Sequence, residues 1–162
     1  MHIPDGFLDP KISSGLWGVA GLALAYSFAK VRAMVTALKP AEALATTTGN
    51  ISRGVRRVLT GQGERTIYQM GMVAALVFAA QMFNFPISDG TSGHLIGGVF
   101  SAVILGPFAG TIVISAVLAV QMFFFADGGL LAIGANIVNM ALAGTILAYY
   151  IYYYLKKIAP EW

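Results

Sequence analysis

The sequence predicts an all-α integral membrane protein, a bundle of about five transmembrane helices preceded by an ordered N-terminal segment. Of its 162 residues, 57% are apolar and only 10% are charged, whereas soluble domains carry about 25% charged residues. The mean hydropathy is +0.75. In the stretch between Arg65 and Lys156, only Asp89 and Asp127 are charged. Because a charge in mid-membrane costs roughly 2.5–3.5 kcal/mol on insertion scales, this stretch is expected to contain several spans.

Charge and residue types exclude several classes of protein. The formal net charge is +3, and positive charge in a membrane protein mostly follows topology, so no nucleic-acid partner is expected. The sequence has no cysteine, which excludes disulfides and thiolate metal sites. It has no glycine-rich phosphate-binding loop and no grouping of serine or carboxylate residues typical of catalysis. We therefore expect a protein that is not an enzyme, with any ATP hydrolysis in partner subunits.

Residues 1–11 are expected to form a compact lead-in to the first helix. Two prolines and Gly6 favour turns, and Phe7 with Leu8 is an apolar pair suited to packing against the protein. The alternative is a frayed chain end. No basic region precedes the first apolar run, so a cleaved signal peptide is not expected. Met1 is expected to be retained, because a bulky histidine follows it.

Charge-free runs, turn residues and basic flanks predict the order of the spans. The expected layout is the lead-in at 1–11, span 1 at 12–38, a cytoplasmic basic loop at 39–66, span 2 at 67–87, an external loop at 88–94, span 3 at 95–106, span 4 at 107–126 and span 5 at 129–155. A single kinked helix over residues 95–126 is the alternative to spans 3 and 4. It would put Lys156 and Lys157 opposite the basic loop, so the positive-inside bias favours two helices that meet at Gly106-Pro107.

The basic loop allows two interpretations. Ile51 and Val55 fall on one helical face, and Arg53, Arg56 and Arg57 lie elsewhere around it. This pattern is typical of a basic amphipathic helix on the membrane surface, although a plain cytoplasmic loop would satisfy the same charge bias. We expect a surface helix that also sets the orientation. The N-terminus and the loop at 88–94 are then both external.

His2 and His94 are the only histidines in the chain, and the layout puts both on the external side. A histidine at position two allows a chelate: the amine of Met1 and the amide of His2 close a five-membered ring, and that amide and the ring Nδ1 close a six-membered one. Three nitrogens then lie nearly in a plane, with His94 available for the fourth corner. Square-planar nitrogen ligation suits Ni(II) and Cu(II), with Co(II) possible. Such a site should release protons on binding and weaken at acid pH.

A lone histidine near a membrane surface more often packs or caps than binds metal, but two sole histidines on one side favour a metal site formed by Met1, His2 and His94. Four polar residues are candidates for orienting these ligands: Asp89, Ser92, Asp127 and Asn136. Helix capping is the alternative role for Asp127. Amide side chains in spans usually join helices, which is the alternative for Asn136 and the expectation for Gln81 and Gln121.

Three stretches resemble the CbiM/NikM family, the substrate-capturing membrane components of energy-coupling-factor (ECF) transporters for cobalt and nickel. Residues 1–8 read Met-His-Ile-Pro-Asp-Gly-Phe-Leu, residues 90–98 read Gly-Thr-Ser-Gly-His-Leu-Ile-Gly-Gly with Leu-Gly-Pro at 105–107, and residues 127–136 read Asp-Gly-Gly-Leu-Leu-Ala-Ile-Gly-Ala-Asn. The resemblance implies a square-planar ion held by the terminal amine, the amide and imidazole of residue two, and a later histidine. On this chain these are Met1, His2 and His94, the residues that chelate geometry also indicates.

The resemblance further implies the protein's setting. It implies uptake of Ni(II) or Co(II) across the cell membrane of a prokaryote, with a link to cobalamin biosynthesis. The partners are a transmembrane coupling subunit and two cytoplasmic ATPase subunits, and a small accessory membrane protein is also allowed. Family members have about seven spans, and this chain resembles the first five. Either the chain is a shortened form or a neighbour supplies the remainder.

Two other functions are compatible with the composition. A membrane-embedded metalloenzyme would use the same ion, but no catalytic carboxylate or base is expected beside the histidines. A structural subunit of a membrane complex would need neither histidine. The sequence does not separate nickel from cobalt as the substrate. For a given set of ligands, affinity rises from cobalt through nickel to copper, so selectivity must come from the geometry of the site and the supply of metal.

Overall fold

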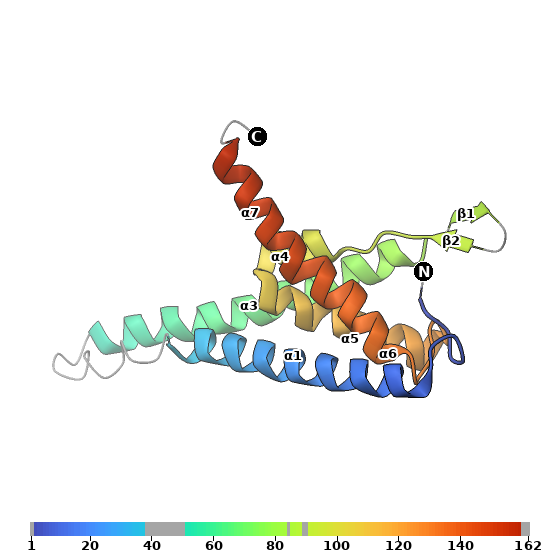
Figure 1. Cartoon of the computed structure of the whole chain (residues 1–162). Coiled ribbons are helices and arrows are strands. Elements are labelled where there is room, and N and C mark those ends of the chain that lie inside the picture. Colours follow the sequence, from blue (N-terminus) through green and yellow to red (C-terminus); the bar gives the residue numbers. More distant parts are fainter. Residues whose placement is uncertain (1, 38–50, 84, 89–90, 160–162) are drawn as a thin grey trace.

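The computed structural model describes residues 2–37, 51–83, 85–88 and 91–159, and its elements are almost all helices (Figure 1). In chain order they are α1 (Pro10–Ala37), α3 (Ile51–Gln81), β1 (Phe85–Ser88), β2 (Thr91–Gly93), α4 (Gly98–Leu105), α5 (Pro107–Phe125), α6 (Ile133–Asn136), the π-helix η2 (Ile137–Leu147) and α7 (Ala148–Ile158). The last three follow one another without a break. The predicted all-α class is confirmed, and the lead-in is ordered from His2.

Three helices in the described part of the chain are long and apolar enough to cross a membrane: Pro10–Val35, Pro107–Phe125 and Ile133–Ile158. They correspond to the predicted spans 1, 4 and 5. Helix α4 has eight residues, or about 12 Å at 1.5 Å per residue, which is too short to span alone. Helix α3 is long but carries polar residues over much of its length. The sidedness of these helices stays a prediction.

Helix α3 differs from the layout predicted for residues 39–87. It begins at Ile51 and continues to Gln81, so the helix expected in the basic stretch is continuous with predicted span 2, whereas the layout separates a loop from a span; residues 38–50 lie outside the described part. No proline interrupts residues 51–81, and the stretch is rich in good helix formers. Pro86 then disfavours helix for the residue before it. Instead Phe85 pairs with Gly93 in an antiparallel β1–β2 ribbon.

Gly106-Pro107 divides the long charge-free run, as predicted. Helix α4 ends at Leu105, Gly106 has a φ of 84°, and Pro107 is the first residue of α5. A positive φ suits glycine, and proline suits the first helical position, where its missing N–H is not needed. The two-helix interpretation of residues 95–126 is confirmed. Helix α1 also has a proline, Pro10, at its first position. The Asp9 carboxylate before it accepts a hydrogen bond from Lys11 N at 2.8 Å.

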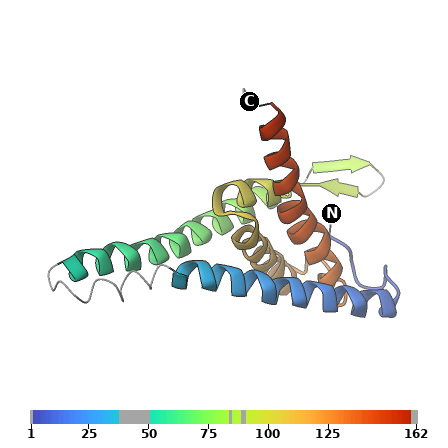
Figure 2. The same cartoon turned by 60° about the vertical axis from the view of Figure 1, so that its left-hand side comes forward.

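Helix α5 lies in the middle of the bundle, packed against α1, α3, α4 and η2 (Figure 2). Its Ile114 and Leu118 are fully buried. Polar side chains also join the helices. Gln121 on α5 donates a hydrogen bond to Gln81 on α3 at 2.9 Å, and Thr111 on α5 bonds Thr145 on η2 at 2.6 Å. The predicted interhelical role of Gln81 and Gln121 is confirmed.

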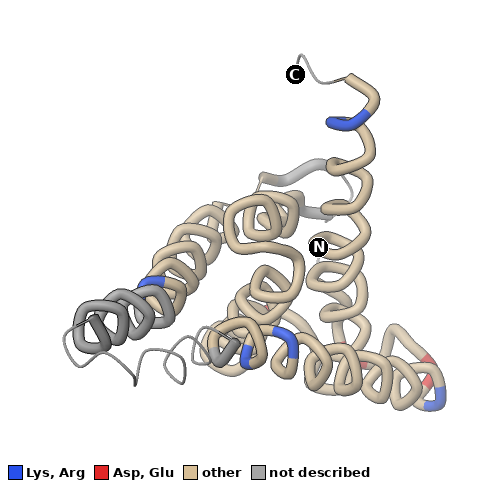
Figure 3. Tube along the Cα trace, turned by 90° about the vertical axis from the view of Figure 1, so that its left-hand side faces the viewer, with Lys and Arg blue, Asp and Glu red and all other residues tan. Residues whose placement is uncertain are grey.

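Charge is sparse over this bundle. Most of the tube in Figure 3 is neither acidic nor basic, and the acidic positions that it colours lie at one end, where the lead-in meets the start of α1. Lys156 and Lys157 lie in the last turn of α7. This distribution suits helices whose middle parts lie in lipid, where a charge is costly. The bundle therefore has two polar ends, and the two histidines lie at the acidic one.

Candidate metal centre

The structure brings His2 and His94 into contact. Their ring centroids are 5.1 Å apart and their planes differ by 22°. The Nε2 atom of each ring is buried and has no hydrogen-bond partner in the described part of the chain. Buried polar atoms are nearly always satisfied, so these two imidazole nitrogens are candidates to bind a ligand. Met1, the third predicted metal ligand, lies outside the described residues.

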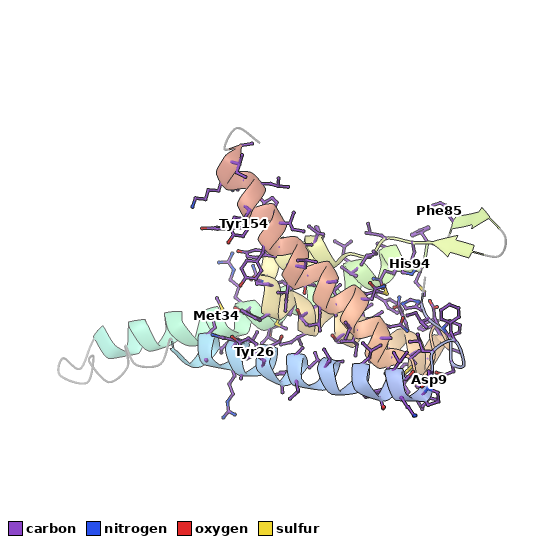
Figure 4. The ribbon with its side chains drawn as sticks, in the orientation of Figure 1. Asp9, Tyr26, Met34, Phe85, His94 and Tyr154 are labelled. Carbon is purple, nitrogen blue, oxygen red and sulfur yellow. The ribbon has the colours of Figure 1, made fainter. Side chains whose placement is uncertain are left out.

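His94 is held in the tautomer that suits a metal ligand. Its Nδ1 lies 3.0 Å from the carbonyl oxygen of Leu95. A carbonyl only accepts, so Nδ1 carries the proton and Nε2 keeps a free lone pair. In Figure 4, His94 lies beside the N-terminal lead-in, between β2 and the body of the bundle.

Two buried glutamine side chains hold the segment that carries His94. Gln81 donates a hydrogen bond to the carbonyl oxygen of Ile96 at 2.7 Å, and Gln121 in turn donates to Gln81. Both glutamine side chains are fully buried. Ile96 is two residues beyond His94, so this chain of amides from α3 and α5 fixes the backbone on which His94 stands.

His2 is buried and faces Asp127. Its side chain is 3% exposed, against 35% for Asp127, and its Nδ1 lies 2.8 Å from the Asp127 carboxylate. Burial lowers the pKa of His2, and this outweighs the opposing effect of Asp127. The ring is therefore neutral at physiological pH, the form that binds metal. Asp127 thus contacts the ring that it is predicted to orient, and the role itself stays a prediction. The chelate, however, requires Nδ1 to exchange this carboxylate for the ion.

Asn136 fixes the residue that follows His2. Its side chain accepts a hydrogen bond from Ile3 N at 2.9 Å and donates one to Ile3 O at 3.2 Å. Gly129 N also donates to Ile3 O, at 3.1 Å. Asn136 thus acts on the backbone of the lead-in and not on a histidine ring. Asp89, another predicted orienting residue, lies outside the described residues, as does the side chain of Ser92.

Asp5 anchors the lead-in, a contact that the sequence does not predict. Its carboxylate accepts hydrogen bonds from the backbone N–H groups of Leu130, Leu131 and Ala132, at 3.0, 2.8 and 3.2 Å. These donors lie just before α6, where unpaired N–H groups favour a carboxylate. In the sequence, Pro-Asp-Gly indicates only a turn, and nothing local shows that its carboxylate caps a segment more than a hundred residues away.

Gly129 is required by this close approach. A Cβ added there would lie 2.1 Å from Oδ1 of Asp5 and 2.4 Å from its backbone nitrogen. Gly128 has a φ of 104°, and a Cβ on it would lie 3.3 Å from Cβ of His2. The lead-in therefore packs directly against Gly128 and Gly129. This close packing explains why both positions are glycine, which the turn pattern alone does not.

Replacing Gly129 with alanine is expected to displace the lead-in from Gly128 and Gly129 and weaken Ni(II) binding about tenfold, while the helices remain folded. The added methyl group collides with backbone atoms that cannot move independently, and supporting changes around metal ligands typically cost about 10–100-fold in affinity. Titration calorimetry would measure the loss. Gly15→Ala is the matched control, because a Cβ there meets nothing within 4 Å; equal affinity of the two variants would contradict the docking role.

Side chains alone do not complete the site. In the described ranges, no group of three or more His, Cys, Asp and Glu residues is placed to hold a metal ion. Two imidazoles would therefore need further donors. The Asp127 carboxylate already contacts His2 Nδ1. The predicted amine and amide ligands would come from the chain start, where Met1 lies outside the described residues.

Comparison with known proteins places the chain in a family. Residues 35–162 match the family described as the cobalt uptake substrate-specific transmembrane region, CbiM. The chain belongs to the CbiM family. Curated relatives include a putative fused nickel transport protein NikMN of Archaeoglobus fulgidus, 37% identical over 97% of this chain and 43% of the relative. A cobalt transport protein CbiM of a Roseiflexus species is 30% identical over 100% of this chain and 55% of the relative.

Solved structures agree with the CbiM assignment. A transition metal transporter superposes with a TM-score of 0.74 at 29% identity, covering 98% of this chain and 58% of the other. A truncated transition metal transporter gives 0.73 at 28% identity, covering 98% and 61%. The chain thus spans roughly two fifths to three fifths of the length of these proteins. The predicted family and the helical membrane fold are confirmed, and the relatives are named as nickel and cobalt transport proteins.

Proposed function

We propose that this chain captures Ni(II) or Co(II) as the substrate-binding component of an ATP-driven ECF-type uptake transporter. The observation that supports this most directly is the pair of sole histidines, held in contact at the chain start with both Nε2 atoms buried and unpartnered. Membership of the CbiM family adds the class of substrate. In this proposal the ion is cargo and not a cofactor.

The proposed ligands are the amine of Met1, the amide and Nδ1 of His2, and Nε2 of His94. Ile3 is held at both its N–H and its C=O, so the backbone beside the proposed amide ligand is fixed before the ion arrives. Such preorganisation reduces the entropy that binding would otherwise cost. Asp127 holds the His2 ring until Nδ1 turns to the ion. Its carboxylate then remains beside a divalent cation, where a negative charge is favourable.

The partners in this proposal are a transmembrane coupling subunit and two cytoplasmic ATPase subunits. Helix α1 offers a face for such a partner. A Cβ added at Gly15, Gly18 or Gly21 would meet nothing within 4 Å, so these three glycines form a small-residue stripe on α1 that no described residue covers. Small residues at this spacing let helices approach closely in lipid. The proposed cellular setting is a prokaryotic plasma membrane with the histidines outside.

Titration calorimetry on the purified chain with its native N-terminus tests the proposal. Ni(II) and Co(II) are expected to bind one ion per chain, whereas Mg(II), which prefers oxygen ligands, should not bind the site. Bound Ni(II) should show the visible absorbance of a square-planar nitrogen site. An octahedral spectrum would reject the amide ligand, and no binding at all would favour a structural subunit. Turnover of a substrate by the metal-loaded chain would favour a metalloenzyme.

A further inference from the structure

A pocket lies in the part of the bundle away from the histidines. It has a volume of about 760 Å³ and is lined by the C-terminal part of α1, the middle of α3, the α4–α5 turn, and Tyr149 of α7. This volume is within the range of about 300–1,000 Å³ that is usual for small-molecule sites. Met34, one of its lining residues, is labelled in Figure 4 on the part of α1 far from His94. The transport proposal does not use this pocket.

The lining combines two positive charges with apolar walls. Among the described residues that line it, Lys30 and Arg65 are the charged ones and none is acidic. Most of the remaining lining is apolar, including Val35, Ile104 and Phe108. An apolar pocket with no counter-charge for two cations suits a ligand that is itself part apolar and part anionic.

A third source of positive potential is the first turn of α5. This helix starts at Pro107 inside the lining, and its N-cap residue, Gly106, makes no side-chain capping bond. A helix N-terminus carries roughly half a positive charge and its free N–H groups favour anions. The N-terminus therefore adds to the two side-chain charges that already line the same cavity.

Lys30 is held at the wall by aromatic contacts. Its ammonium group lies 5.4 Å from the ring centroid of Tyr26, and Tyr26 packs edge-on against Phe108 at 5.5 Å. Among the described residues, no carboxylate forms an ion pair with Lys30. Through Tyr26, the cation is linked to Phe108 in the first turn of α5.

We propose that this pocket binds one anionic phospholipid. Its phosphate contacts Lys30, Arg65 and the α5 N-terminus, and an acyl chain lies along Val35 and Ile104. Basic pockets between transmembrane helices on the cytoplasmic side are typical anionic-lipid sites. The Gly106-Pro107 turn is on the predicted cytoplasmic side, whose leaflet carries anionic lipid. A free phosphate would leave the apolar walls unused, which is why the lipid is the occupant that fits.

Native mass spectrometry of the purified full chain in detergent tests this proposal. Added phosphatidylglycerol is expected to remain bound at one molecule per chain, at least about tenfold tighter than phosphatidylcholine. The double variant Lys30→Ala/Arg65→Ala should bind phosphatidylglycerol about thirtyfold more weakly. Lys30→Arg/Arg65→Lys, which keeps both charges, should retain it. Lys156→Ala/Lys157→Ala is the matched control, because these two lysines lie in the last turn of α7 and do not line the pocket.

Three outcomes would overturn the lipid site. Equal retention of phosphatidylglycerol and phosphatidylcholine would mean that Lys30 and Arg65 do not distinguish an anionic headgroup from a neutral one. The pocket would then be a surface for another polypeptide. Equal loss in the pocket variant and the control variant would mean that net charge alone attracts the lipid. Displacement of the lipid by millimolar inorganic phosphate would identify a free anion as the ligand. Circular dichroism of each variant checks that the helices are intact.

Discussion

A chain extended by two residues before Met1 is expected to bind Ni(II) and Co(II) about a thousandfold more weakly than the native chain. The extension converts the Met1 amine into a peptide nitrogen and moves the free amine out of the five-membered ring with the His2 amide. Chelation works because linked donors act at high effective concentration, a gain of roughly 10²–10⁴. Titration calorimetry on the two proteins, both carrying any purification tag after Trp162, measures the difference.

The length of that extension decides what the experiment reports. One added residue makes the histidine third in the chain, so that the amine, two amides and the imidazole can fill a square plane alone. That variant is expected to bind Ni(II) whether or not His94 is present. With two added residues the histidine is fourth in the chain, so neither the native chelate, with histidine second, nor the chelate with histidine third can form. If the chain extended by two residues binds as tightly as the native one, the terminal amine is not a ligand.

The helical class, the order of the elements and the break at Gly106-Pro107 could be predicted because they follow from local patterns. Charge-free runs indicate spans, and a glycine followed by a proline both ends one helix and starts the next. The start of α3 could not be predicted in this way. Arginines on a helix that leaves the membrane look, in sequence, the same as arginines in a loop, because the positive-inside bias applies to both.

The site was predictable as far as residue chemistry and topology reach. The rarity of histidine and its position in the chain indicated that His2 and His94 meet, which the structure shows. The carboxylate of Asp5 and the missing side chain of Gly129 have no such signal, because their role depends on contacts between residues more than a hundred positions apart. Asp127 is among the predicted orienting residues, but the sequence does not show that its carboxylate contacts Nδ1 of His2. Counting the bonds between donor atoms predicts the chelate, but it does not predict that Asp127 contacts Nδ1 of His2.

Replacing His94 with alanine is expected to reduce Ni(II) affinity by at least about a hundredfold. Changes to residues that only orient a ligand cost about 10–100-fold, so loss of a ligand should reach or exceed the upper end. Some binding should remain, because the amine, amide and imidazole of the chain start are intact and water can take the open corner. The visible band should then shift toward lower energy, since water is a weaker donor than imidazole.

Leu95→Ala is the control for His94→Ala. Leu95 is 58% exposed, and its carbonyl, which holds Nδ1 of His94, belongs to the backbone and survives the substitution. The control should therefore keep both the affinity and the spectrum of the native chain. The chain extended by one residue provides a second test, since its binding should not respond to His94→Ala. Native affinity and spectrum in the His94→Ala variant would show that the fourth donor comes from elsewhere, and a response in the extended chain would show that its complete terminal chelate does not form.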